Sequence, residues 1–174
     1  MQKRRSLRLD GYDYRNTGVY FVTVCTHQKR CVFGKILNDS MIPNECGFVV
    51  KEEWKRAEIL RSNVELDMFV LMPNHLHGLI LLRDEQDDGQ RSASDFAATP
   101  TSSTLQAGSL GAIIGQFKSV ATKRIRRLNN PPDMPIWQRN YYESIIRTPV
   151  IWNRARDYIA TNPMRWREDS LYVA

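Results

Sequence analysis

The stretch MFVLMPNHLHGLILL, residues 68–82, constrains the fold of this chain more than any other segment. It is almost wholly apolar, but Pro73 and Asn74 interrupt it with a dipeptide that favours a turn or a bulge. The pattern therefore predicts two strands joined at that dipeptide. Side chains two residues apart in a strand point to the same face of a sheet. We therefore expect His75 and His77 to emerge together, while Leu76 enters the layer beneath.

Two of the three histidines of the chain are thus predicted side by side on a rigid strand. Paired imidazoles of this kind form half of a metal site. The alternative is structural, because a histidine in a strand often only makes hydrogen bonds in the core or at the surface.

Other segments show the periodicities of strands and helices. A stretch rich in β-branched and aromatic residues predicts a strand at residues 19–26. A short hairpin is expected at residues 31–41 and a further strand at residues 136–147. Amphipathic patterns predict helices at residues 44–61, 110–130 and 148–163. In the first of these helices the apolar positions are Phe48, Val49, Trp54, Ile59 and Leu60. The element order predicts an α+β fold, a ferredoxin-like sandwich with a central antiparallel sheet, packing helices and an added C-terminal helix.

With 174 residues the chain is expected to form a single domain, 1–174, interrupted by a flexible insert at residues 84–109. The insert is acidic, since residues 84–108 carry a net charge of −4 within a chain of net charge +6. A basic body favours a polyanionic partner such as nucleic acid, although solubility alone is the simpler explanation. Apolar runs are too short to span a membrane and no secretory signal is evident, which favours a cytoplasmic protein with free thiols.

The C-terminal helix carries the second group of candidate site residues. Its expected N-cap is Thr148, with Pro149 in the first turn. Tyr158 and Asn162 are four residues apart and so stack on one flank of the helix. Tyrosine there usually packs, and Asn162 before Pro163 is typical of a helix end.

If Tyr158 and Asn162 lie beside the histidine pair, the four side chains could together carry out phosphoryl transfer. A divalent ion held by His75, His77 and Asn162 would polarise a phosphate, and none of the three ligands would bring negative charge. The phenol of Tyr158 could then attack phosphorus and become covalently linked to DNA. The adjacent residues Tyr141 and Tyr142 are rival nucleophiles.

Five segments, in this order, resemble the single-tyrosine HUH transposases, most of all the REP-associated tyrosine transposases of bacteria. They are RRSLRLDGYDYRNTGVYFVTVCT, VLMPNHLHGLI, LGAIIGQFKSVATKRI, WQRNYYESIIR and RDYIATNPMRW. The resemblance covers nearly the whole chain except residues 84–109. It identifies His75 and His77 with the metal-binding HUH motif, Tyr158 with the nucleophile and Asn162 with the third ligand.

The resemblance implies a Mg²⁺- or Mn²⁺-dependent enzyme that cleaves single-stranded DNA near palindromic hairpins and forms a 5′-phosphotyrosine. Members of the family act as monomers or as homodimers. Basic residues are the expected DNA contacts: Arg4, Arg5, Arg8, Lys118, Lys123, Arg124 and Arg127. Tyr12, Tyr14 and Trp137 could stack on unpaired bases. The expected setting is the bacterial cytoplasm, in association with the nucleoid.

Two other functions compete with a transposase. A catalytically silent binder of nucleic-acid hairpins would keep the basic surface without needing the set His75, His77, Tyr158 and Asn162. An HUH relaxase or replication initiator would share the chemistry, but the small size and the single tyrosine on the terminal helix disfavour it.

Overall fold

The computed structural model describes residues 17–83 and 108–173. At its centre is a four-stranded antiparallel sheet with the strand order β4-β5-β1-β6. The strands are β1 (Gly18–Cys25), β4 (Val64–Leu71), β5 (His75–Leu82) and β6 (Tyr142–Ile146). A separate hairpin pairs β2 (Gly34–Leu37) with β3 (Ser40–Pro43).

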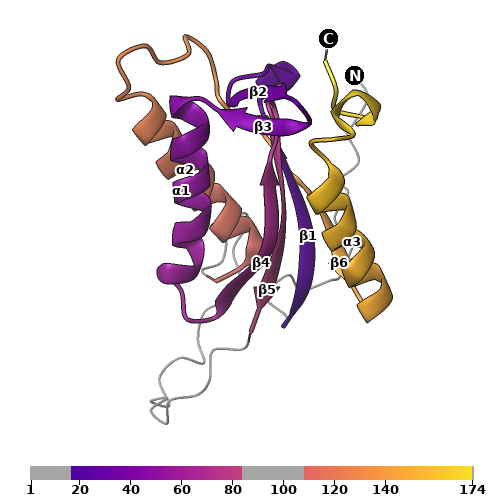
Figure 1. Ribbon diagram of the computed structural model, residues 1–174. Coiled ribbons are helices and arrows are strands. Elements are labelled where there is room, and N and C mark those ends of the chain that lie inside the picture. The colour runs from indigo at the N-terminus through magenta and orange to yellow at the C-terminus, as the bar shows by residue number, and fades with distance from the viewer. Residues whose placement is uncertain (1–16, 84–107, 174) are drawn as a thin grey trace, which may run out of the picture.

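Three helices cover the two faces of the sheet (Figure 1). They are α1 (Glu45–Ile59), α2 (Leu110–Ile125) and α3 (Pro149–Thr161). The first two pack together on one face, and α3 lies on the other. Apart from the β2-β3 hairpin, the order β1-α1-β4-β5-α2-β6 is that of a ferredoxin-like fold with α3 added. The predicted α+β sandwich is confirmed.

Side-chain caps fix the start of each helix. Asn44 accepts a hydrogen bond from the amide of Gly47, Ser109 from that of Ala112, and Thr148 from that of Ile151. The predicted cap at Thr148 is confirmed. Ser109 caps α2 rather than belonging to the predicted insert 84–109, Gly108 precedes it, and residues 84–107 of the insert lie outside the described residues.

Strand alternation separates the core from the α3 face. Tyr20, Val22 and Val24 of β1 and Leu76 and Ile80 of β5 are all fully buried in the hydrophobic core. Leu76 therefore enters the layer beneath the histidines, as predicted. Gly78 lies on this same face of β5, where a Cβ would overlap the indole of Trp54 in α1.

Three apolar residues of the predicted helix 44–61 do not contribute to the core as the helical pattern predicted. Val49 and Trp54 are buried, but Phe48, Ile59 and Leu60 are exposed. The helix packs through a narrow face, so positions at its margin and its C-terminal end remain in solvent.

The last strand is shorter than the predicted span 136–147. Trp137 forms only an isolated bridge with Thr26, and β6 begins at Tyr142. The ammonium of Lys118 donates to the carbonyls of Gln138 and Asn140, so a side chain takes the place of a strand partner there. The α2 helix likewise ends at Ile125, before the predicted residue 130. None of the described helices has the length and apolar character needed to cross a membrane.

Candidate metal and nucleophile site

The two predicted histidines lie side by side at the start of β5, on the face covered by α3. His75 pairs with Cys25 and His77 with Thr23 across the β1-β5 ladder. Their ring centroids are 4.4 Å apart with an interplanar angle of 67°, and both side chains are buried. The two imidazoles thus point in the same direction from the strand, and burial keeps both of them away from solvent.

A hydrogen bond with Asn74 determines the tautomer of His75. The amide nitrogen of Asn74 donates to the carbonyls of Lys29 (2.9 Å) and Leu171 (2.8 Å), which leaves its Oδ1 as an acceptor. That oxygen lies 2.8 Å from His75 Nδ1, so Nδ1 carries the proton. The lone pair of His75 is therefore on Nε2, which is buried and has no hydrogen-bond partner among the described residues.

Thr23 and Phe21, both on β1, hold the second histidine. The Thr23 hydroxyl lies 2.8 Å from His77 Nδ1, and the Phe21 ring stacks on the imidazole at 5.3 Å. A proton on Nδ1 donated to Thr23 leaves Nε2 of His77 free to bind a cation, as metal-binding histidines require.

The α3 helix brings Tyr158 to this pair. Its hydroxyl lies 3.3 Å from His77 Nε2 and donates to Asp169 Oδ2 at 3.1 Å. The helix is anchored on the sheet because Asp67 of β4 accepts from Trp152 Nε1 (2.5 Å) and from Arg156 (2.8 Å). The irregular pairing of β4 with β5 between Leu66 and Phe69 occurs at this same point of the strand.

The end of the chain completes the site with Asn162 and Asp169. Asn162, directly after α3, is buried and donates from Nδ2 to Asp169 Oδ2 at 2.8 Å. Its Oδ1 is a second buried acceptor without a hydrogen-bond partner in the described part of the chain. Asp169 Oδ2 is also 3.9 Å from Nε2 of each histidine, and the Leu171 amide donates to its other oxygen.

These residues fit a divalent cation. His75, His77 and Asp169 each offer one ligand atom, and these atoms lie within 4.8 Å of one another. Separations of 3.9 Å between imidazole nitrogen and carboxylate oxygen suit two ligands that each lie about 2.1 Å from one ion. The unpartnered Oδ1 of Asn162 is an oxygen of the type that Mg²⁺ and Mn²⁺ prefer, and its role as a ligand stays a prediction.

Burial and mutual proximity control the charges of the site. Burial, aided by neighbouring His77, lowers the pKa of His75 to about 3, so its imidazole is neutral and able to bind metal. Burial raises the pKa of the Asp169 carboxyl, but interactions with His77 and Asn162 outweigh it and hold that pKa well below its ordinary value. Burial and the Asp169 charge raise the pKa of Tyr158 to about 12.

The structure brings together the four predicted residues His75, His77, Tyr158 and Asn162. The rival tyrosine pair lies at the start of β6, and β1 separates that strand from β5.

The four predicted DNA-binding residues that the structure describes lie in α2 or directly after it, on the face of the sheet opposite α3. Lys123 and Arg127 are exposed near the end of α2, on the opposite face of the sheet. Arg124 is paired with Glu52 and Glu53, and burial lowers the pKa of Lys118 to about 8. Their contact with DNA stays a prediction, and Arg4, Arg5 and Arg8 fall outside the described residues.

Asp169 is the site residue that sequence reasoning missed. It corrects the expectation of a ligand set without negative charge. No local pattern marked it, because it lies beyond the predicted helix, directly after a short 3-10 helix at Trp166–Glu168. The role of Asn74 was also missed, since its place after Pro73 was explained by the turn alone.

Comparison with known proteins identifies a relative by sequence and a solved structure with a similar fold. The chain is 38% identical over 170 residues to an uncharacterized protein of Haemophilus influenzae, and the match covers 98% of this chain and 93% of that protein. No family model matches the chain. A solved structure of a REP-associated tyrosine transposase bound to a REP hairpin is similar, with a TM-score of 0.56 and 20% identity. That match covers 95% of this chain and 74% of the transposase, and it establishes a shared fold.

Proposed function

The chain belongs to one family with the uncharacterized Haemophilus influenzae protein and has the fold of a REP-associated tyrosine transposase, and from this premise we propose that it is a metal-dependent DNA transposase. Its substrate would be single-stranded DNA that forms palindromic hairpins, in keeping with the REP hairpin bound to that transposase. The reaction would be cleavage and rejoining through a 5′-phosphotyrosine on Tyr158.

One observation carries this proposal: a phenol, two buried imidazoles and a carboxylate meet at one corner of the sheet, where the Tyr158 side chain is still exposed to solvent. The Tyr158 hydroxyl is 3.3 Å from His77 Nε2, and both histidines are 3.9 Å from Asp169 Oδ2. A protein that only binds hairpins has no need for this arrangement. The buried acceptors His75 Nε2 and Asn162 Oδ1 likewise favour a bound cation over a purely structural histidine pair.

The residues of the chain would divide the work as follows. His75, His77 and Asp169, with the amide oxygen of Asn162, would hold Mg²⁺ or Mn²⁺. A cation there would neutralise the charge that develops on the phosphate oxygens and lower the pKa of the nearby phenol. Asn74 and Thr23 orient the two imidazoles through Nδ1. The anchor at Asp67 holds α3 so that the phenol faces the histidines.

The covalent step exchanges one phosphoester for another. Oxygen of Tyr158 attacks phosphorus as its proton leaves, the bond to the 3′-oxygen breaks, and that oxygen takes up a proton as a 3′-hydroxyl. The fragment downstream of the break remains linked to Tyr158 through its 5′-phosphate, and the upstream fragment carries the free 3′-hydroxyl. In the reverse direction a 3′-hydroxyl attacks the phosphotyrosine, restores a DNA phosphodiester and frees the phenol, so no nucleotide cofactor is consumed.

Covalent capture tests the function directly. The protein would be incubated with Mn²⁺ or Mg²⁺ and labelled single-stranded hairpins drawn from the palindromes of its own genome, then run on a denaturing gel. We expect a labelled adduct for the wild type with metal, and none without metal, for Tyr158→Phe or for His75→Ala. Tyr142→Phe is the matched control and should leave the adduct intact.

An adduct that persists in Tyr158→Phe would move the nucleophile elsewhere. Tight hairpin binding by a wild type that forms no adduct with either metal would identify a silent binder instead.

A further inference from the structure

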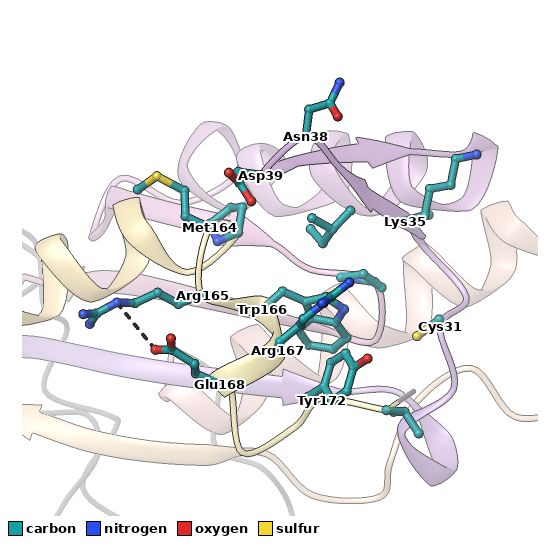
Figure 2. Close-up of a pocket in the computed structure, with 15 residues that line it drawn as sticks. Cys31, Lys35, Asn38, Asp39, Met164, Arg165, Trp166, Arg167, Glu168 and Tyr172 are labelled. Atoms are coloured by element: carbon teal, nitrogen blue, oxygen red, sulfur yellow. Dashed lines mark ion pairs between the residues drawn. The ribbon is translucent and has the colours of Figure 1, made fainter.

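A second feature of the molecule is a pocket of about 620 Å³ between the β2-β3 hairpin and the segment that follows α3 (Figure 2). Lys35, Asn38 and Asp39 of the hairpin line one side. Trp166 and Tyr172 lie on the other side, so two chain segments far apart in sequence form its walls. This volume is within the range of about 300–1,000 Å³ that is typical of small-molecule sites.

The pocket shares a wall with the candidate metal site. Trp166 lines the pocket, and its ring also lies 5.9 Å from that of His75. Pro73 and Glu168 line the pocket too, and each directly precedes a residue of the site, Asn74 or Asp169. A strand with one phosphate at the histidines therefore has a neighbouring nucleotide within reach of the pocket.

The chemistry of the lining suits an unpaired nucleotide. Trp166 forms a buried aromatic floor, and Tyr172, which contacts it edge-on at 5.2 Å, is partly exposed. Lys35 and Arg167 bring positive charge from opposite walls, and Asp39 adds a polar group that a base edge could contact. Aromatic rings beside cationic side chains are the usual elements of single-stranded DNA binding.

We propose that this pocket binds an unpaired nucleotide of the single-stranded substrate, next to the phosphate that is cleaved. The inference rests on the proposed function and adds a base-binding subsite to it. The base would stack on Tyr172 above the Trp166 floor, and Lys35 would contact the adjoining phosphate. The hairpin and the C-terminal segment would then select which nucleotide flanks the cleavage position.

Photocrosslinking of the full chain tests the pocket without any substitution. The probe is a fluorescein-labelled dT strand of about 16 nucleotides, the upper end of common site sizes, that carries a single 5-iododeoxyuridine. We expect crosslinked peptides from residues 34–39 or 163–173. Crosslinks confined to other peptides would overturn the proposal.

Binding of the same probe to variants gives a second, quantitative test. Loss of one stacking ring should weaken binding about 5- to 150-fold in Tyr172→Ala, while Tyr172→Phe keeps wild-type affinity. Lys35→Ala should also weaken binding. Phe48→Ala and Lys55→Ala are matched controls, because both side chains are exposed on α1 outside the pocket. Equal affinity in the pocket variants and the controls would refute the pocket.

The two experiments separate this inference from the proposed function. Formation of the Tyr158 adduct without a crosslink in the pocket would refute the subsite alone. A crosslink in the pocket without any adduct would refute the transposase and keep a binding pocket. No binding of single-stranded DNA would refute both.

Discussion

Replacement of Asn74 by alanine should destabilise the protein by about 2–3 kcal/mol, because each buried hydrogen bond that is lost costs about 1 kcal/mol. The Asn74 side chain is buried and makes three hydrogen bonds, to His75 Nδ1 and to the carbonyls of Lys29 and Leu171. The two carbonyls are only partly buried and can recover some hydration, which sets the lower end of the range. The imidazole nitrogen cannot, since His75 is fully buried.

Urea unfolding at neutral pH in the absence of metal would measure this loss, together with thermal melting. A loss of this size should lower the Tm by about 4–12 °C for a chain of this length. Asn74→Asp should not rescue stability, because its second oxygen would face two carbonyls. Asn153→Ala, at an exposed position of α3, is the control and should stay within about 0.5 kcal/mol of wild type. A loss below about 1 kcal/mol in Asn74→Ala would show that these bonds do not hold the C-terminal segment in place.

Four further results are expected. Asp169→Asn should lower the pKa of Tyr158 from about 12 towards its ordinary value, because the carboxylate raises it; ¹³C-tyrosine NMR would show this, and an unchanged titration would contradict it. His75 has a folded-state pKa of about 3, below its ordinary 6.5, so its contribution to stability is complete above pH 6.5. Metal-free protein should lose about 1.4 kcal/mol per pH unit as the pH falls from 6.5 towards 3, and a flat profile in urea unfolding would refute this. Gly78→Ala should cost at least about 1–3 kcal/mol by overlap with Trp54, unlike an alanine at an exposed site. Mn²⁺ should raise the Tm in proportion to the logarithm of its concentration, and His75→Ala should abolish that rise.

Much of this fold could be predicted because its periodicities are simple. The strand alternation around Pro73 and Asn74 predicted both the β4-β5 pair and the common direction of His75 and His77, and the ladder with β1 confirms it. The helical spacing of Tyr158 and Asn162 likewise predicted their shared flank. These are local properties of one strand or one helix.

The parts that could not be predicted depend on tertiary contacts. Asp169 reaches the site only because the chain turns back after Trp166 and is held by Asn74, more than ninety residues earlier. The predicted strand at 136–147 is shortened because Lys118 from α2 binds carbonyls within it. Neither contact leaves a pattern in the local sequence.

The meeting of Arg83 and Gly108 beside Asn63 bears on how this chain can tolerate changes in length. The Arg83 amide donates to the Asn63 carbonyl, and Gly108 lies next to the Asn63 side chain, so the two points that flank residues 84–107 adjoin one residue. That residue is at the end of β5 opposite His75, a separation of about 23 Å along the strand. Deletion of the intervening residues, or their replacement by a short linker, is therefore expected to leave the positions of His75 and His77 unchanged. The sheet alone fixes those positions.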